Sequence, residues 1–186
     1  MVIQNDSNKA REARVLAMGE CLFEAGHAGP VWQVTRGMLR LERIGEEGAS
    51  FVQLALPGDL VGVEALCAEP YAFSVAAVVD SEAVALVLDS DAARHQTLAH
   101  AFLQQQRRTA EAVRLRSGSV ASRVEHFLGT LAQASGALTQ RVRDAELPYL
   151  RDIAQIVDSA PESVCRAMSG LVAPRRPRRH RSPAAA

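Results

Sequence analysis

The sequence predicts an α+β protein in which an N-terminal antiparallel β jelly roll, a long helix and a C-terminal helix-turn-helix domain follow one another. Three observations favour this class. Short apolar runs separated by turn residues fill the chain from about residue 20 to 88, residues 91–117 contain no Pro or Gly, and two short amphipathic segments flank a three-residue turn at 158–160. Strands followed by helices along the chain are typical of an α+β fold.

The predicted strands are short and lie between turn residues, as in a sandwich or jelly roll. In the run 50–56, Val52, Leu54 and Leu56 share one face, as a half-buried strand requires. The full set is a turn at 26–30, strands at 31–34 and 38–44, a hairpin loop at 45–48, a strand at 50–56, a turn at 57–59, and strands at 74–79 and 83–88.

The composition indicates a folded protein with its own core. The chain has 186 residues, of which 48% are hydrophobic and 23% are charged, whereas aromatic residues make up only 4%. Leu, Val and Ala must therefore build most of the core, and a disordered chain is excluded. The sequence contains no apolar run of about 20 residues and has a polar start, so we expect a cytoplasmic protein with no membrane partner.

The net charge of zero hides an asymmetry between the two halves. Residues 1–90 carry 6 Lys/Arg and 13 Asp/Glu, and the remaining residues carry 15 and 8. Five arginines fall within residues 174–186, among prolines that prevent a helix, so this basic tail is expected to be disordered. A basic half indicates a polyanionic partner.

A helix of about 26 residues is predicted from Asp91, with Ser90 or Asp91 at its N-cap. Its apolar positions recur every 3.5 residues, which predicts packing against a second copy of the same helix in a homodimer. The alternative, that the helix packs only on its own jelly roll, stays open because polar residues interrupt the seam. The seam positions are Leu98, Phe102, Gln105, Thr109, Ala112 or Val113, and Arg116.

After a second helix at 120–134, residues 148–171 have the spacing of a helix-turn-helix. This motif needs a small residue where the helices cross, a residue that tolerates a left-handed turn, and a β-branched anchor in the second helix. Ala154, Asp158 and Val164 meet these needs at offsets of four and ten. Ser159 and Glu162 form a capping-box pattern that predicts Ser159 as the N-cap.

The second helix of the motif offers polar side chains to a DNA groove. Arg166 can donate two hydrogen bonds to guanine, and Glu162 can accept one from cytosine or orient the arginine. Ser163 and the amides at the start of the helix suit phosphates. Roles as a capping partner for Glu162 and as a solvated surface charge for Arg166 stay open. The residues expected to contact DNA are Ser159, Glu162, Ser163, Arg166, Ser169, Arg175 and Arg176.

The cysteines and histidines predict neither an enzyme nor a metal centre. The three cysteines are far apart, without the spacing of a zinc site or an iron–sulfur cluster. The histidines do not combine with carboxylates at ligand spacing. These residues are Cys21, Cys67, Cys165, His27, His95, His100, His126 and His180.

Over residues 19–172 the chain resembles the CRP/FNR superfamily of bacterial transcription regulators. The resemblance is carried by Gly37 after Arg36, the Leu-Pro-Gly-Asp-Leu-Val-Gly segment at 56–62 with Glu-Ala-Leu at 64–66, the long helix, and residues 152–166. The Pro-Gly-Asp segment is similar to the FNR branch. The family implies a cyclic-nucleotide-binding-like sensor domain at 1–90, a dimerisation helix at 91–118, a DNA-binding domain at 119–173 and a tail at 174–186. It also implies double-stranded DNA, a second copy and RNA polymerase as partners.

The resemblance places an effector pocket at Gly62, Glu64, Ala65, Phe73 and Ser74. Members that bind cyclic nucleotides hold the ribose with a glutamate, which Glu64 matches, and the phosphate with an Arg-Ser pair. Here only Ser74 of that pair is present, and a buried phosphate without a cation is unfavourable. The effector is therefore unknown, a cyclic nucleotide and an iron–sulfur cluster are not expected, and a haem stays open with His27 as a candidate ligand.

The end of the chain departs from the family pattern, because no strand pattern for a two-stranded wing follows residue 173. Either the arginine tail replaces the wing as a phosphate-binding arm, or specific DNA binding is impaired. The main prediction is a homodimeric regulator that binds a near-palindromic promoter site. The alternative is an effector-binding or redox-sensing module with impaired specific DNA binding.

Overall fold

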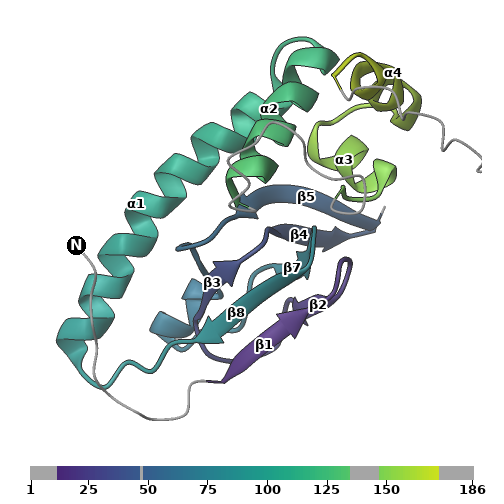
Figure 1. Cartoon of the computed structure of the whole chain (residues 1–186). Helices are drawn as coiled ribbons and strands as arrows, with labels where there is room; N and C mark the ends of the chain where they lie inside the picture. Colours follow the sequence, from purple (N-terminus) through teal and green to yellow (C-terminus); the bar gives the residue numbers. More distant parts are fainter. Residues whose placement is uncertain (1–11, 47, 135–146, 172–186) are drawn as a thin grey trace, which may run out of the picture.

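The computed structural model describes residues 12–46, 48–134 and 147–171 (Figure 1). The N-terminal half is an antiparallel β sandwich, a long helix lies along one side of it, and three helices follow. This order of parts agrees with the sequence prediction. None of the described helices combines the length and the apolar character needed to cross a membrane.

Each layer of the sandwich is a four-stranded antiparallel sheet. Most successive strands lie in opposite sheets, so that residues distant in the sequence become neighbours. One sheet has the order β1 (Ala13–Leu16), β8 (Ser81–Ala85), β3 (Trp32–Arg36) and β6 (Leu60–Val61). The other has the order β2 (Cys21–Phe23), β7 (Ser74–Ala77), β4 (Leu39–Gly45) and β5 (Gly48–Ala55).

The strand predictions were correct in position and wrong at several boundaries. The strand expected at 31–34 extends to Arg36, and that expected at 74–79 ends at Ala77. The expected 45–48 loop is shorter, because Gly45 and Gly48 are paired within the hairpin. Strands β1, β2 and β6 were not predicted, since two to four residues are too few to show an alternating pattern.

Gly37 connects β3 to β4 in a conformation that requires glycine. Its φ is 81°, and a Cβ at this position would lie 2.5 Å from the carbonyl oxygen of Asp80 and would also meet Ser81. The Ser81 hydroxyl accepts a hydrogen bond from the amide of Met38, so this corner is closely packed. The family-like Arg-Gly pair is thus explained by the geometry of the turn.

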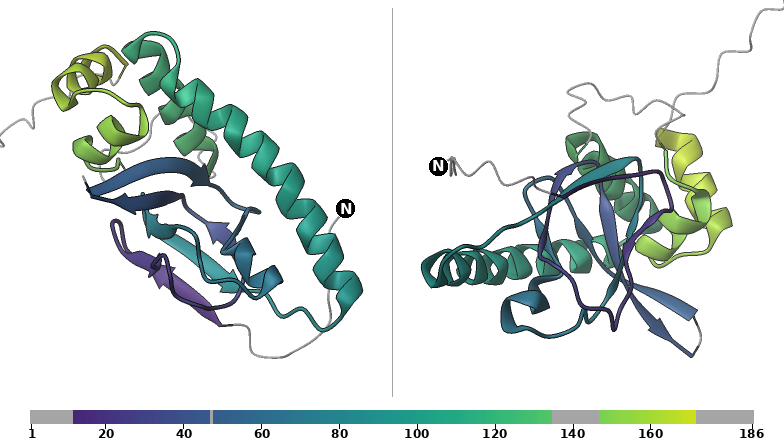
Figure 2. Two further views of the ribbon diagram at one scale, coloured as in Figure 1. Left: turned by 180° about the vertical axis from the view of Figure 1, so that it is seen from behind. Right: turned by 90° about the horizontal axis from the view of Figure 1, so that it is seen from below.

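The helices are η1 (Val63–Cys67), α1 (Asp91–Arg116), α2 (Val120–Ala134), α3 (Leu150–Ile156) and α4 (Pro161–Leu171). The predicted N-cap of α1 is confirmed, because the Ser90 hydroxyl accepts a hydrogen bond from the amide of Ala93. Helix α1 contacts β5, η1 and α2, and α3 lies against β5 (Figure 2). Helix α3 therefore packs on the same sandwich that α1 covers, and α4 packs on α2 and α3.

One hydrophobic core joins the sandwich to the C-terminal helices. It combines side chains from the sandwich strands and their turns with buried residues of every α-helix. Phe127 and Leu131 of α2 are fully buried in it. The remaining members are Met38, Phe51, Leu54, Val78, Val79, Leu115, Val124, Ala134, Ile153, Ala154, Ile156, Val157 and Val164. A second core cluster, around Trp32, Leu39 and Val75, fills the space between the sheets.

Candidate functional site

Helix α3, a turn and helix α4 follow one another at the positions in the sequence where the spacing predicted two helices and a turn. Asp158 adopts the left-handed conformation with φ 49°, and the amide of Ser159 donates to the carbonyl of Ala154 over 2.9 Å. Ala154 and Val164 are buried where the helices meet. The three residue types chosen from the sequence thus take the positions expected of them. Of the apolar residues on these two helices, Leu150 and Leu171 are exposed.

The predicted N-cap of α4 was wrong by one residue. The helix begins at Pro161, and the carbonyl of Ala160 accepts hydrogen bonds from the amides of Ser163 and Val164. Ala160 therefore precedes the helix, while Ser159 belongs to the turn. Pro161 takes the first helical position, which proline favours, so the residue before it precedes the helix.

The outer face of α4 presents polar side chains to solvent. Glu162, Arg166 and Ser169 are exposed and Ser163 is partly buried. The Ser169 hydroxyl donates to the carbonyl of Cys165 on the same helix, over 2.8 Å. Within the described part of the chain Arg166 has no ion-pair partner, so its guanidinium is free to bind a ligand. Arg175 and Arg176 lie outside the described residues.

Arg123 on α2 supports the turn before α4. Its Nη1 donates to the carbonyl oxygens of Val157, over 2.5 Å, and Asp158, over 2.9 Å. These carbonyls lie at the end of α3, where the helix leaves acceptors without partners. Arg123 was missed by sequence reasoning, because nothing in its own helix indicates a contact 34 residues away.

A buried ion-pair cluster connects the sandwich to α3. Arg40 on β4 places its Nε 2.9 Å from an oxygen of Glu42 and its Nη1 3.0 Å from an oxygen of Asp152. Asp152 is only 3% exposed, and Glu42 is also buried. Removing charged groups from water is costly unless they are paired. The sequence indicated Asp152 only as part of the helix-turn-helix segment. It gave no sign that Asp152 contacts Arg40 on β4.

A cavity of about 330 Å³ lies between the sandwich and α1. We call it the α1 cavity. Strand residues form its floor and the helix forms its wall, and most of the lining surface is apolar. The lining residues are Phe23, Leu41, Val52, Gln53, Leu60, Val61, Gly62, Val63, Glu64, Phe73, Val75, Leu98, Ala101, Phe102, Gln104 and Gln105.

The structure brings three of the five predicted effector-pocket residues into the α1 cavity. Gly62, Glu64 and Phe73 line it, and the Glu64 carboxylate accepts a hydrogen bond from the amide of Ala72 over 3.3 Å. Ala65 and Ser74 do not line it, and the Ser74 hydroxyl accepts from the amide of Ala25 instead. Ser74 begins the buried strand β7, while Phe73 before it and Val75 after it line the cavity.

The polar groups of the α1 cavity are amides and a single carboxylate. Gln104 binds both backbone groups of Leu60, with its Oε1 2.7 Å from the amide and its Nε2 2.8 Å from the carbonyl. Gln53 donates to Gln105 over 3.2 Å. No Lys or Arg belongs to the described lining. These residues do not fit the phosphate of a cyclic nucleotide, which needs a cation when it is buried.

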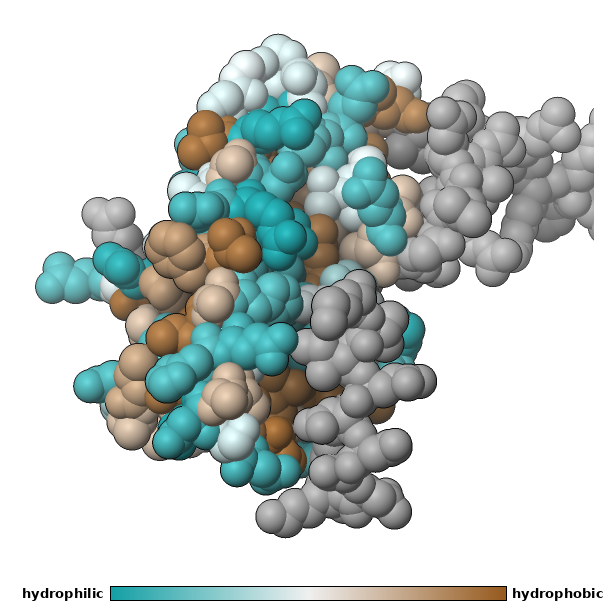
Figure 3. Space-filling model, turned by 90° about the vertical axis from the view of Figure 1, so that its left-hand side faces the viewer, coloured by the Kyte–Doolittle hydropathy of each residue, from teal (hydrophilic) through white to brown (hydrophobic). Residues whose placement is uncertain are grey.

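Helix α1 presents an apolar seam to solvent beside the α1 cavity. Phe102 is 64% exposed and Val113 is 58% exposed, and Leu98 and Leu103 are also exposed. Figure 3 shows hydrophobic side chains interspersed with hydrophilic ones on the side of the molecule along which α1 runs. Exposure of several large apolar residues on one helix is typical of a surface that binds another protein.

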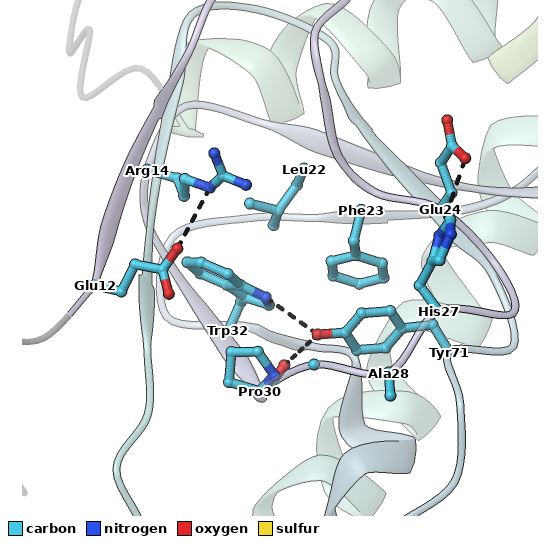
Figure 4. A pocket seen from close by; sticks show the side chains of 11 residues that line it. Glu12, Arg14, Leu22, Phe23, Glu24, His27, Ala28, Pro30, Trp32 and Tyr71 are labelled. Carbon is cyan, nitrogen blue, oxygen red and sulfur yellow. Dashed lines mark hydrogen bonds and ion pairs between the residues drawn. The ribbon is translucent and has the colours of Figure 1, made fainter.

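A second, more open cavity of about 270 Å³ lies near β1 and β2 (Figure 4). The Tyr71 hydroxyl donates to the carbonyl of Pro30 over 2.7 Å and accepts from Trp32 Nε1 over 3.3 Å, while the Tyr71 ring stacks on Phe23. Burial raises the pKa of Tyr71 above 10.0, with a smaller contribution from Glu64. The stabilisation from neutral Tyr71 is thus complete below pH 10 and is lost as pH rises through this raised pKa.

His27 lies at the edge of this second cavity. Its Nδ1 is 4.0 Å from a carboxylate oxygen of Glu24, and both side chains are largely exposed. In the described ranges no three His, Cys, Asp or Glu residues come together as metal ligands, and the three cysteines are free and exposed.

Comparison with known proteins identifies the N-terminal half and the overall fold. Residues 13–99 match the family model of the cyclic nucleotide-binding domain. A CRP-family transcriptional regulator from Thermus thermophilus is 23% identical, with a TM-score of 0.68, over 85% of this chain and 83% of that one. FixK2 from Bradyrhizobium japonicum is 21% identical, with a TM-score of 0.65, over 88% and 85%.

A third solved structure, a CRP/FNR-family regulator that also comes from Thermus thermophilus, is 22% identical with a TM-score of 0.56, over 86% of this chain and 85% of that one. No curated protein sequence matches the chain significantly. Because these identities are low, the solved structures establish the fold of this chain. Its effector and its DNA site have to be argued from its own residues.

Proposed function

Because the chain contains a cyclic nucleotide-binding domain and has the fold of CRP/FNR-family transcriptional regulators, we propose that it is a sequence-specific DNA-binding regulator that acts as a homodimer. The proposal rests above all on the exposed polar face of α4, which the left-handed turn at Asp158 and the buried Val164 hold in place. In this proposal, residues 1–90 form the sensor domain, residues 91–118 the dimerisation helix and residues 119–173 the DNA-binding domain.

The DNA contacts follow from the side chains that α4 exposes. Inserted into a major groove, α4 would direct Arg166 to O6 and N7 of a guanine, with Glu162 one turn earlier facing the paired cytosine. Ser163, Ser169 and the amides at the start of α4 would contact phosphates. Ser159, in the turn, and Arg175 and Arg176 complete the proposed set of phosphate contacts. These contacts predict a G·C pair at a fixed position of each half-site.

The homodimer is supported by the seam on α1. Leu98, Phe102, Thr109 and Val113 recur at near-heptad spacing, and each has an exposed or partly exposed side chain in the single chain. A second copy of α1 would cover these side chains. Dimerisation by a two-fold axis would place the two α4 helices in successive major grooves, so that the DNA site is a near-palindrome.

We expect Val113→Glu to weaken dimerisation, because it places a charge in the apolar seam that the second copy of α1 would cover. The expected increase in the dimer dissociation constant is at least about tenfold, equivalent to about 1.4 kcal/mol. Analytical ultracentrifugation over a concentration series measures it. Gln96→Glu is the control, because it adds the same charge on an exposed part of α1 away from the seam. If both variants dimerise as the wild type does, the dimer does not form through this seam.

We expect Arg166→Ala to reduce the affinity for the specific site by about 1–3 kcal/mol and to have much less effect on random DNA. The reason is that two hydrogen bonds to guanine distinguish sequences, whereas a phosphate contact does not. Fluorescence anisotropy over a salt series measures both affinities. Arg151→Ala removes an exposed arginine from α3 and is the control. Equal losses on specific and random DNA would show that Arg166 contacts only phosphate.

RNA polymerase is a further partner that this proposal includes, since a promoter-bound regulator acts through transcription. The alternative function is an effector-binding or redox-sensing module without specific DNA binding. The presence of the α1 cavity is compatible with either function. Effector binding without any preferred DNA sequence would favour the alternative.

A further inference from the structure

The α1 cavity has the position of a sensor pocket and the wrong charge for a cyclic nucleotide. A cyclic nucleotide carries a phosphate, and moving an unpaired anion into an apolar site is strongly unfavourable. The described lining contains one acidic side chain, Glu64, and no basic one. An anionic ligand would therefore lose its hydration and meet a carboxylate as well.

An arginine beside this lining is held outside the cavity. Arg43 on β4 is exposed, and its guanidinium lies 5.7 Å from the centre of the Phe73 ring, in a cation–π contact. Phe73 lines the cavity and Arg43 does not. The aromatic ring thus already interacts with this positive charge, and a ligand in the cavity is not in contact with it.

The remaining polar groups of the cavity suit an uncharged ligand. The side-chain amide of Gln104 hydrogen-bonds both backbone groups of Leu60. It therefore forms part of the cavity wall and is not counted as a hydrogen-bonding partner for a ligand. Gln53 and Gln105 bind each other, and each amide keeps a further donor or acceptor that a ligand can use. A mostly apolar wall with a few placed polar groups is typical of small-molecule sites.

We propose that the α1 cavity binds an uncharged, mainly apolar small molecule rather than a cyclic nucleotide. This inference rests on the proposed function, since it names the ligand class of the proposed sensor domain. The ligand would lie against Ala101 and Phe102 of α1. It would also form hydrogen bonds with the side-chain amides of Gln53 and Gln105, either in place of the bond between them or in addition to it. Because the same helix carries the apolar seam, the ligand would act directly on the element that forms the dimer.

The test compares two fluorescent probes with the same aromatic skeleton, neutral N-phenyl-1-naphthylamine and anionic 8-anilino-1-naphthalenesulfonate. We expect the full-length protein to bind the neutral probe at least about tenfold more tightly than the sulfonate, because the sulfonate loses its hydration in the cavity without gaining a cation. Cyclic AMP is added as a competitor and is expected not to displace the neutral probe.

Substitutions on α1 assign the binding to the cavity. Ala101→Phe fills it and should weaken binding of the neutral probe at least about tenfold, whereas Ala99→Phe on the exposed side of the same helix should leave it unchanged. Gln105→Arg places a cation in the lining and should shift the preference toward the sulfonate. Circular dichroism and ultracentrifugation confirm that each variant keeps its fold and oligomeric state.

Three results would overturn the proposal. The first is binding of the sulfonate as tight as that of the neutral probe, lost in Ala101→Phe. The second is displacement of the neutral probe by cyclic AMP. The third is binding of neither probe, or binding that Ala101→Phe does not change. If Arg43→Gln also removes sulfonate binding, Arg43 is the missing cation and the ligand is an anion.

The probe experiment is carried out without DNA, so its outcome is separate from the proposed function. If the protein binds no specific DNA sequence but binds the probe in a way that depends on Ala101, it is a sensor module. The inference about the cavity then holds although the proposed function fails. Specific DNA binding without probe binding would keep the regulator and reject the inference.

Discussion

Replacing Phe127 by alanine is expected to lower the free energy of unfolding by about 3–5 kcal/mol, because it removes a large, fully buried ring and leaves a cavity. Phe127 lies in α2 within the core that joins the sandwich and the C-terminal helices. The substitution is therefore expected to destabilise the whole described fold and not only α2. Equilibrium denaturation in urea, followed by circular dichroism, measures this change.

The same experiment tests whether the sandwich and the C-terminal helices unfold together. With one shared core, we expect a single cooperative transition that moves as a whole in Phe127→Ala. Glu125→Ala is the control on the same helix, because Glu125 is exposed and its replacement should change stability by less than about 0.5 kcal/mol. Two separate transitions, with only one shifted, would show that the helices form an independent unit.

Replacing Arg40 by alanine is expected to cost about 3 kcal/mol of stability, because it leaves the buried Glu42 carboxylate without its cation and leaves Asp152 with only the exposed Arg151. The loss of Asp152's partner also removes the polar link between β4 and α3. Denaturation measures the stability, and proteolysis of the native protein measures how often the C-terminal helices detach.

The chain provides a matched control for Arg40 in the ion pair between Arg36 on β3 and Glu82 on β8. Arg36 Nε lies 2.9 Å from a Glu82 oxygen, the same distance as that from Arg40 Nε to Glu42, but the Arg36 pair is exposed. Arg36→Ala should therefore cost less than about 1 kcal/mol. Equal losses in the two variants would show that burial adds nothing to the Arg40 cluster.

The helical half of the fold could be predicted because its signals are local. The serine N-cap and the absence of Pro and Gly predicted α1, and the offsets between Ala154, Asp158 and Val164 predicted the turn before α4. Each of these features depends on backbone geometry within about ten residues. The predicted N-cap Ser159 was wrong because Pro161 takes the first helical position and Ala160 therefore precedes the helix.

The site in the sandwich could be predicted only in part, because its residues come together from distant strands. The resemblance indicated Gly62, Glu64 and Phe73, which line the α1 cavity. It could not indicate the α1 wall, although Leu98, Phe102 and Gln105 were singled out as seam positions for another reason. The contact of Arg40 with Asp152 joins residues with no sequence relation, so no pattern could show it.

The central claim is that α4 of a homodimer recognises a DNA sequence. Selection by the full-length protein from a library with randomised, two-fold-symmetric sites tests this most directly. We expect enrichment of a near-palindrome with a G·C pair in each half-site and half-sites about 10 base pairs apart, and loss of the preference for that G·C pair in Arg166→Ala. If the wild type enriches no sequence, and the form that ends at Ala173 loses all DNA affinity, α4 does not recognise DNA in this protein.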